Sequence, residues 1–258
     1  MAVRRWWTGP VGAYPVLLYH GIAEAAARPA EGAKFWVAAA QAAAQWCWLR
    51  DQGPGVTTLA EAWAGRGEGR AVITFDDGGS SDYEAAYPAL QTCGLSATFF
   101  VNPARVGQVG FASWAHLTSM SRNGMAIASH GWDHGDLTQP SEAGLREQLR
   151  RSKQEIEQHT GERVRFLAAP YGYYDRRLAR IAGEEGFDAV CTSTNRWARA
   201  GGAEVPRVAV YGRTTLGQFA ALAAGQAGAY WRRRARTWAL ARAGHALYRW
   251  RQAEAGRA

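Results

Sequence analysis

The sequence predicts an α/β protein built on a mainly parallel sheet or barrel. Short apolar runs, typical of strands buried on both faces, alternate with segments of helical periodicity. Several polar residues stand directly after the predicted strands, where parallel α/β folds build their sites. At 258 residues the chain can bury one sizeable core. We therefore expect one main domain over residues 1–229, followed by a basic tail over residues 230–258.

The expected elements follow from the hydrophobic pattern and from the residues that interrupt it. In chain order we expect a strand at 14–22, a helix at 35–50, a strand at 71–75, a helix at 83–93, a strand at 95–101, a helix at 114–123, a strand at 124–130, a helix at 141–159, a strand at 164–170, a helix at 175–185, and strands at 187–193 and 205–210. The first helix is Ala-rich and is stopped by Gly53 and Pro54. The strand at 71–75 runs directly into Asp76 and Asp77.

The formal charge of +8 is concentrated at one end of the chain. Residues 230–258 hold eight arginines and one glutamate, so the rest of the chain is nearly neutral. A nucleic-acid groove would spread Lys and Arg over a binding face, and we therefore expect no nucleic-acid partner. The tail fits a weakly amphipathic basic helix that lies at an anionic membrane surface. The alternative is a solvated helix packed on the main domain.

Cysteine usage and the start of the chain bear on its location. Cys47, Cys93 and Cys191 are odd in number and far apart in the sequence, which indicates core thiols. Residues 1–21 contain no apolar run of about 7 to 15 residues and no small-residue cleavage site. No stretch approaches the roughly 20 apolar residues that cross a bilayer. We therefore expect a cytoplasmic protein, with peripheral contact to the inner face of the membrane if the tail binds lipid.

Two clusters of polar residues carry the candidate chemistry. In TFDDG, at 74–78, two adjacent carboxylates leave an apolar strand and point in different directions, so they can serve two roles. In SHGWDH, at 129–134, His130 and His134 stand at another strand end. Two imidazoles and one carboxylate are a common catalytic zinc set that leaves a position for water. The metal lowers the pKa of that water towards about 7 and polarises a carbonyl group.

Each cluster taken alone has a simpler explanation. An Asp-Asp-Gly sequence is often a turn or a helix cap. A His-x-x-x-His pair is often two surface histidines. Their joint occurrence at the ends of successive buried strands favours a shared chemical site over either simple explanation.

Four motifs resemble those of a known family in order and spacing. TFDDG at 74–78, YPAL with ATFFV at 87–101, SHGWDHGDL at 129–137 and APYGYYD at 169–175 resemble the polysaccharide deacetylase (NodB-homology) family, carbohydrate esterase family 4. The opening VLLYHG and the late VPRVAV resemble the branch that contains the poly-N-acetylglucosamine deacetylases. The resemblance covers about residues 14–210. It implies a distorted (β/α) barrel and a catalytic domain within residues 1–229.

The resemblance also implies roles for individual residues. Asp77, His130 and His134 would bind one divalent metal ion, zinc by preference and otherwise cobalt or nickel. Asp76 would be the general base that takes a proton from the attacking water. Attack on an acetamide carbonyl gives an oxyanion, which the metal and the backbone N–H of Tyr171 would hold.

The turn that follows the fourth strand motif adds further candidates for substrate contact. Pro170 and Tyr171 form the Pro-Tyr-Gly turn of the oxyanion site that the resemblance implies. The rings of Trp132, Tyr171 and Tyr173 could stack against a sugar. The alternative is that these rings belong to the core, as most aromatic side chains of such a chain do.

The departing amine needs a proton, and its donor is not obvious. Much of the family takes this proton from a histidine in a late Leu-x-His motif, which this sequence lacks. His159 lies in a charged helix and His245 lies in the basic tail. In the branch that opens with a Tyr-His strand end the early histidine is the acid, so His20 is the candidate here. The alternative is that His20 only caps its strand.

Two positions depart from the family pattern. Ala168 stands where the family often has an arginine that pairs with the base, so another group must orient Asp76. Arg207 in VPRV is the candidate for that partner. Gly131 replaces the Ser or Thr that often follows the first ligand histidine, which can loosen a supporting contact without removing a ligand.

We therefore expect a metal-dependent hydrolase that removes N-acetyl, or another short N-acyl, groups from amino sugars in a glycan. One alternative is a deacylase of a small or lipid-linked sugar, because loops set the length of the cleft. A second alternative is a non-catalytic glycan-binding relic of the same fold. The presence of both Asp76 and Asp77 beside two histidines argues against the relic, since sugar binding alone needs no water-activating base.

Overall fold

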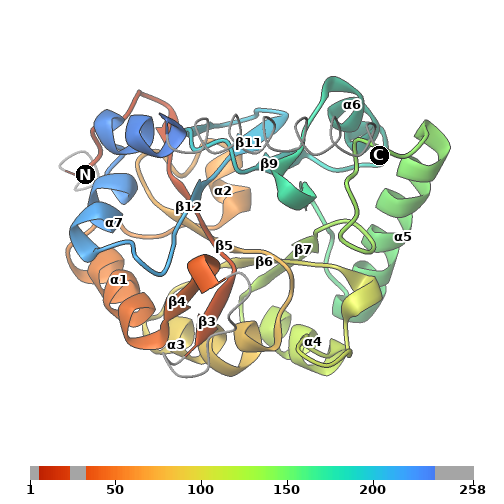
Figure 1. Cartoon of the computed structure of the whole chain (residues 1–258), viewed down its shortest axis with the longest axis horizontal. Coiled ribbons are helices and arrows are strands. Elements are labelled where there is room, and N and C mark those ends of the chain that lie inside the picture. The colour runs from red at the N-terminus through yellow and green to blue at the C-terminus, as the bar shows by residue number, and fades with distance from the viewer. Residues whose placement is uncertain (1–5, 24–32, 236–258) are drawn as a thin grey trace, which may run out of the picture.

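An eight-stranded, parallel sheet forms the centre of the molecule. The computed structural model describes residues 6–23 and 33–235 (Figure 1). Neighbouring strands run in the order β11-β9-β8-β7-β6-β5-β2-β12, and every hydrogen-bonded pair is parallel. The strands are β2 (Val16–Tyr19), β5 (Val72–Phe75), β6 (Thr98–Val101), β7 (Ala126–Ser129), β8 (Phe166–Ala168), β9 (Ala189–Thr192), β11 (Glu204–Pro206) and β12 (Val208–Ala209). The predicted α/β fold with a parallel, barrel-like sheet is confirmed.

The sheet curls into a nearly closed barrel at Arg207. β11 pairs with β9 at one edge of the sheet, and β12 pairs with β2 at the other edge. Only Arg207 separates β11 from β12, so the two edges of the sheet meet at this residue. The single strand predicted at 205–210 is therefore wrong. The segment is two short strands on opposite edges, because the chain must step across the seam of the barrel.

Two smaller sheets correct the predicted elements near the start of the chain. The predicted strand at 14–22 is divided among β1 (Ala13–Tyr14), β2 and β3 (Gly21–Ala23). The predicted helix at 35–50 begins late: η3 (Ala33–Phe35) and β4 (Trp36–Ala38) precede α1 (Ala39–Asp51). β4 pairs with β3, and the Trp36 ring lies so close to Gly21 that a Cβ there would come within 2.5 Å of it. β1 pairs with β10 (Ala198–Arg199).

Helices cover the outside of the sheet (Figure 1). The remaining helices are α2 (Leu59–Trp63), α3 (Tyr87–Thr92), α4 (Trp114–Arg122), α5 (Glu142–Thr160), α6 (Arg176–Glu184) and α7 (Leu216–Ala223), and the short turns are η4 (Asp82–Ala86), η5 (Pro103–Arg105) and η6 (Pro170–Gly172). Side chains of Ser113, Ser141 and Asp175 cap the first turns of α4, α5 and α6. The helix predicted at 83–93 is present as the π-helix η4 in its first half and as α3 in its second half.

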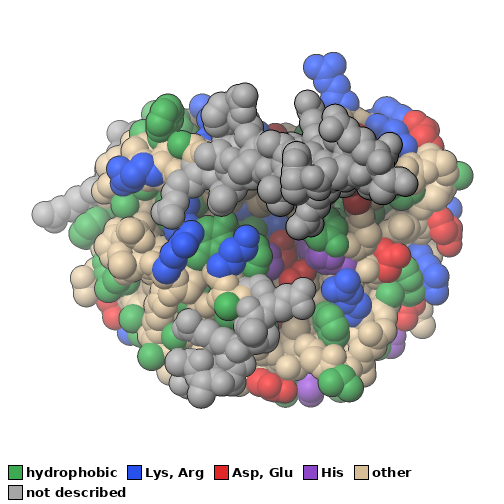
Figure 2. Space-filling model, viewed as in Figure 1, with side chains coloured by type: hydrophobic (Ala, Val, Ile, Leu, Met, Phe, Trp, Pro, Cys, Tyr) green, Lys and Arg blue, Asp and Glu red, His purple; other side chains and the backbone are tan. Residues whose placement is uncertain are grey.

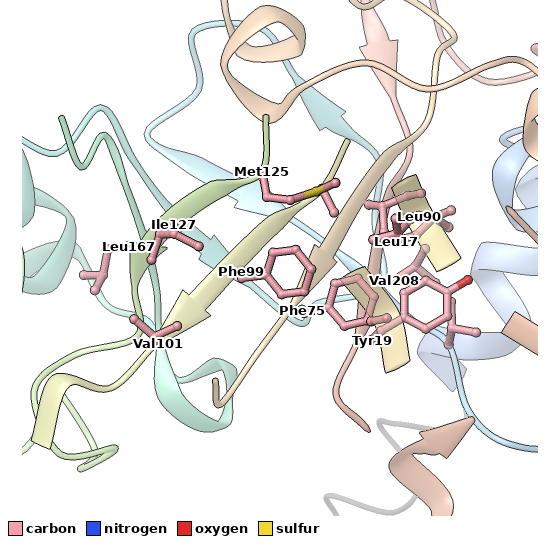
Figure 3. Close-up of a cluster of buried hydrophobic side chains, with 14 of the residues drawn as sticks. Leu17, Tyr19, Phe75, Leu90, Phe99, Val101, Met125, Ile127, Leu167 and Val208 are labelled. Atoms are coloured by element: carbon pink, nitrogen blue, oxygen red, sulfur yellow. The ribbon is translucent and has the colours of Figure 1, made fainter. Parts of the chain in front are cut away.

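Alternating side chains divide the core into two layers. One layer fills the space between the sheet and the helices and includes Tyr19, Phe75 and Phe99 (Figure 3). The other layer fills the barrel, where Ala128, Ala168, Ala189 and Cys191 are small. These small residues leave room for a long side chain inside the barrel. Arg207, one of the largest fully buried side chains, lies there with its guanidinium 5.1 Å from the Phe100 ring centroid.

The structure also bears on two further expectations, those for the cysteines and for the basic tail. The sulfurs of Cys47 and Cys93 lie 3.5 Å apart as free thiols, so two of the cysteines that are distant in sequence are neighbours. Of the predicted tail, only residues 230–235 are described, and they are helical together with residues 227–229. The membrane hypothesis concerns mainly residues 236–258, which lie outside the described residues. Within the described part, none of the helices combines the length and apolar character needed to cross a membrane.

Candidate active site

The candidate residues meet at the carboxyl ends of β2, β5, β7 and β8. Because side chains alternate along a strand, Asp76 lies on the barrel side with Thr74, while Phe75 points towards the helices. By the same alternation His130 follows Ala128 on the barrel side of β7. Asp76 and His130 are 5% and 2% exposed, so both are almost wholly removed from water. The sequence pattern therefore delivers charged groups to a buried edge of the sheet.

Asp77, His130 and His134 form a compact group of three ligand-type side chains. Their donor atoms all lie within 4.8 Å of one another. Nε2 of His134 lies 3.1 Å and Nε2 of His130 lies 3.5 Å from Oδ1 of Asp77. This oxygen is buried and makes no hydrogen bond of ordinary geometry. A buried carboxylate oxygen that faces two imidazole nitrogens fits a divalent cation, and two nitrogens with one oxygen suit zinc.

The surroundings of His130 fix which of its nitrogens faces the group. Nδ1 of His130 lies 2.8 Å from the carbonyl oxygen of Ala168, which can only accept a hydrogen bond. In the neutral imidazole this hydrogen bond puts the proton on Nδ1 and leaves a lone pair on Nε2. The Asn102 amide also donates to the backbone carbonyl of His130. The strand ends on both sides of β7 thus orient the ring.

Electrostatics at the group favour ionised carboxylates. Burial alone would raise the pKa of Asp77, but the imidazoles of His130 and His134 hold that pKa well below its usual range. Burial likewise opposes the charge on His130, yet the carboxylates of Asp76 and Asp77 outweigh it and raise the pKa of His130. The negative charge of Asp76 and Asp77 beside the two imidazoles therefore favours a cation at this group.

Arg207 holds Asp76 through two hydrogen bonds. Nη1 and Nη2 of Arg207 lie 2.6 and 2.7 Å from the two carboxylate oxygens of Asp76, and both side chains are buried. Nε of Arg207 donates to the carbonyl of Thr192 at 3.3 Å. Burial would raise the pKa of Asp76, but the Arg207 guanidinium holds it below its usual range. Ala168 has no side chain that could do this.

His20 lies at the mouth of the same site. With Asp76 and Asp77 it lines a pocket of about 260 Å³, whose walls include the Phe35 and Phe111 rings. The His20 ring packs 4.7 Å from the Phe35 ring centroid, and its Nδ1 is buried without a hydrogen-bond partner. Burial lowers the pKa of His20, and the carboxylates of Asp76 and Asp77 offset this only in part. His20 therefore lines the same pocket as the two carboxylates.

The predicted substrate-contact residues are only partly together. Tyr171 is 62% exposed and its ring lies edge-to-face against His134, with centroids 4.8 Å apart, while Pro170 is buried beneath it. Trp132 instead lies against α5, where the Arg151 guanidinium covers its ring at 3.6 Å from the centroid. That face of the Trp132 ring is not open to a sugar. Tyr171 and Tyr173 are neighbours, with ring centroids 5.6 Å apart.

Strained backbone is concentrated at the site. Among the described non-glycine residues, Asp77, His134, Tyr171 and Asn195 have positive φ angles, of 81°, 69°, 61° and 53°. Such conformations cost free energy and persist where the surroundings enforce them, commonly at functional sites. Three of these residues are candidates from the sequence. The backbone N–H of the fourth, Asn195, donates to the carbonyl of Arg207.

Sequence reasoning missed several residues that support the site. Asp82 is 1% exposed and neither carboxylate oxygen has a hydrogen-bond partner, and burial together with the charges of Asp77 and Asp76 raises its pKa well above the usual value. Ser129 bonds Ser152 of α5 at 2.7 Å and also accepts the N–H of Gly131. In the sequence, only the closeness of Asp82 to TFDDG could have indicated that this residue belongs to the site.

Gly131 and Gly172 have structural reasons to be glycine. Gly131 has φ 76°, a region in which a Ser or Thr at this position would be strained. A Cβ on Gly172, with φ 74°, would fall 2.0 Å from Oγ of Ser193. The Pro-Tyr-Gly turn can therefore approach β9 closely only with glycine, and this approach presents Tyr171 to His134.

Fold and site together define a class of protein. It is a parallel α/β barrel with an Asp-His-His group and a buried Asp–Arg pair at the carboxyl ends of its strands. The model of the polysaccharide deacetylase family matches residues 64–190, so the chain carries a domain of this family. The sequence resemblance to this family is thereby confirmed.

Individual relatives agree with this membership. YxkH of Bacillus subtilis (strain 168), named as a polysaccharide deacetylase, is 25% identical over 185 residues, which are 69% of this chain and 64% of YxkH. The peptidoglycan-N-acetylglucosamine deacetylase PgdA of Listeria monocytogenes is 28% identical over 115 residues, 44% of this chain and 24% of PgdA. The chain thus spans less than two thirds of either relative. The structure of IcaB from Ammonifex degensii superposes with a TM-score of 0.72 and 27% identity, covering 84% of this chain and 98% of IcaB.

Proposed function

We propose that this chain is a metal-dependent hydrolase that removes N-acetyl, or another short N-acyl, groups from amino sugars in a glycan. The convergence of Asp77, His130 and His134 beside the Asp76–Arg207 pair carries this proposal. A group that only bound sugar would need neither a buried ion pair nor an oriented imidazole. We also propose that residues 1–229 form the catalytic domain.

Asp77, His130 and His134 would hold one divalent metal ion, and the two-nitrogen, one-oxygen donor set favours zinc over a harder cation. When bound, such an ion polarises an amide carbonyl and activates water. The hydrogen bond from His130 to the Ala168 carbonyl would leave the Nε2 lone pair available to the ion. This support is expected to matter nearly as much as the ligands themselves.

Asp76 is the proposed general base. Its pKa is held low by Arg207, so Asp76 is ionised and able to accept a proton at neutral pH. A more acidic carboxylate is a weaker base, and Arg207 therefore contributes mainly by fixing the direction of the two oxygens. His20, the remaining titratable candidate, lines the same cavity as Asp76.

His20 is the proposed general acid for the departing amine. It lines the pocket together with Asp76 and Asp77, so its ring borders the space that a substrate would enter. Breakdown of the tetrahedral intermediate breaks the C–N bond, the amine takes a proton, and the acyl group leaves as a carboxylate. The backbone at Tyr171 is proposed to support the oxyanion, because the left-handed turn brings this residue against His134.

The names of relatives support the substrate class. PgdA is named as a deacetylase of N-acetylglucosamine in peptidoglycan, and YxkH as a polysaccharide deacetylase. We propose the same linkage, the acetamide of an N-acetylated amino sugar, as the bond cleaved here. The proposed partner is a glycan rather than a nucleic acid.

Acetate release from N-acetylglucosamine oligomers tests the proposal. The purified protein is expected to release acetate. This activity should stop after treatment with a chelator and return on addition of zinc, cobalt or nickel. Asp76→Asn should bind metal as the wild type does and release at least about 100-fold less acetate per unit time. A protein that holds no metal and releases no acyl group from oligomers or from lipid-linked amino sugars would favour the glycan-binding relic instead.

A further inference from the structure

Two aromatic walls of the catalytic pocket each carry a cation. The Nζ of Lys34 lies 4.7 Å from the ring centroid of Phe35, and the guanidinium carbon of Arg105 lies 5.5 Å from that of Phe111. Phe35, Phe111 and Arg105 line the same pocket as His20, Asp76 and Asp77. Each cation lies over the face of its ring, so the two rings hold positive charge beside the pocket.

Neither cation has an ionic partner among the residues that the structure describes. Among residues 6–23 and 33–235, no carboxylate lies within 4.0 Å of Lys34 or Arg105. Asp76 cannot serve them, because Arg207 occupies both of its oxygens. Asp77 faces the two imidazoles. The N–H donors of the Arg105 side chain thus meet no carboxylate among the described residues.

Other arginines show what a structural guanidinium looks like in this protein. Arg177 donates to the backbone carbonyls of Pro140 and Thr138 at 2.6 and 2.8 Å. Arg70 donates to the carbonyl of Val56 at 2.7 Å. Arg105 has no such side-chain bond among the described residues, although it is only partly exposed and lies at a pocket wall. Its contact with Phe111 positions the guanidinium without using its donors.

The pocket is also small. Its volume of about 260 Å³ is below the roughly 300–1,000 Å³ that is usual for ligand sites. It therefore suits about one sugar unit. An acidic group that reached Arg105 would belong to the sugar being deacylated or to its immediate neighbour. Figure 2 shows how charged side chains are placed on this face of the molecule. Acidic and histidine side chains meet near its middle, with Lys and Arg side chains on both sides.

We propose that Arg105, with help from Lys34, selects amino-sugar glycans that carry an anionic substituent, a carboxylate or a phosphate, next to the acylated nitrogen. This inference rests on the proposed deacylation. A planar guanidinium matches either anion with two parallel hydrogen bonds, whereas an exposed ammonium contributes a weaker, less directional attraction. Arg105 is thus the main specificity residue and Lys34 the minor one.

The test compares kcat/KM for three oligomers of equal length. One is a neutral N-acetylglucosamine oligomer, the second carries lactyl carboxylates on alternate sugars, and the third carries a phosphate group. The wild type is expected to favour at least one anionic oligomer over the neutral one. Arg105→Gln should lower the anionic-to-neutral ratio of kcat/KM about tenfold, through KM, and Arg105→Lys should restore part of it. The carboxylate and phosphate arms identify which anion is selected.

Matched controls separate this site from general electrostatics. Arg122→Gln removes one exposed arginine at the end of α4 and should leave the ratio unchanged. Lys34→Gln should lower the ratio by less than Arg105→Gln does, because Lys34 is exposed. Added salt should raise KM for the anionic oligomers and hardly change it for the neutral one.

The failure of this inference differs from failure of the proposed function. Equal kcat/KM for all three oligomers, with no change of ratio in Arg105→Gln, would overturn the inference while deacylation stands. If the wild type releases no acyl group at all, calorimetric binding of the same oligomers decides instead. Tighter binding of an anionic oligomer that is lost in Arg105→Gln would support the anion site, and equal binding would overturn it.

Discussion

The guanidinium of Arg207 bonds both oxygens of Asp76 across 131 residues of sequence, at 2.6 and 2.7 Å. This contact exists because Arg207 is the single residue between the two strands that form opposite edges of the sheet. Closure of the barrel and orientation of the proposed base therefore depend on the same residue. A substitution that disturbs the closure of the barrel should therefore also disturb the orientation of Asp76.

Replacing Arg207 with Gln should destabilise the protein severely. The substitution leaves the Asp76 carboxylate buried without its cation, a loss of about 3–5 kcal/mol in the free energy of unfolding. Urea denaturation of wild type and Arg207→Gln measures the difference. Arg163→Gln, an exposed arginine with only a 3.9 Å contact to Asp188, is the control and should change stability by less than about 1 kcal/mol.

The same pair predicts a shift in the acid limb of activity. Arg207 lowers the pKa of Asp76, so the stability from this pair is present above the unfolded pKa and is lost as pH falls through the lower folded pKa. Arg207→Lys keeps a positive charge without the two-pronged contact. In this variant the Asp76 carboxyl of the folded protein should titrate at higher pH. The acid limb of the kcat/KM profile should then move to higher pH. An unshifted limb would show that Arg207 does not set the protonation of Asp76.

His20→Gln should retain metal and fold but lose about 100-fold in kcat, as the removal of a general acid does. Burial lowers the pKa of His20, so its protonated fraction falls as pH rises through a value below the usual one. The wild-type kcat should therefore decline towards alkaline pH, and this decline should vanish in His20→Gln. Initial rates over a pH series measure both effects. An unchanged kcat would return His20 to the role of a strand cap.

Asp82→Asn should become relatively more stable as pH rises. The folded pKa of Asp82 is raised, so its contribution to stability is complete below the unfolded pKa and is lost as pH rises towards the folded pKa. Asparagine stays neutral and avoids that loss. With a chelator present, Tm of the variant minus Tm of the wild type should increase by about 2–4 °C for each 1 kcal/mol involved, between about pH 5 and pH 8. A difference that does not change with pH would contradict the assignment.

Local motifs were sufficient to predict the ends of the central strands. TFDDG and SHGWDH each follow an apolar run, and the strand period then delivers Asp76 and His130 to the inside of the barrel. The group of Asp77, His130 and His134 could be anticipated because parallel strands bring their carboxyl ends to one edge. The sequence therefore carried most of the information about the site's position.

What the sequence could not specify depends on contacts between distant segments. Nothing local in VPRVAV indicates that its two halves belong to opposite edges of a sheet, which is why the strand at 205–210 was predicted as one. The short β4 interrupts an Ala-rich helical pattern because pairing with β3 overrides helix propensity.

Metal content measured on Asp77→Ala tests the central claim most directly. Elemental analysis of the wild type, Asp77→Ala and Glu84→Ala, each loaded with zinc and freed of excess, gives the number of ions per chain. Glu84 is an exposed carboxylate on η4 and serves as the matched control. We expect about one zinc ion per chain in the wild type and in Glu84→Ala, and almost none in Asp77→Ala. Equal metal in Asp77→Ala and the wild type, or no metal in any of the three, would contradict the account.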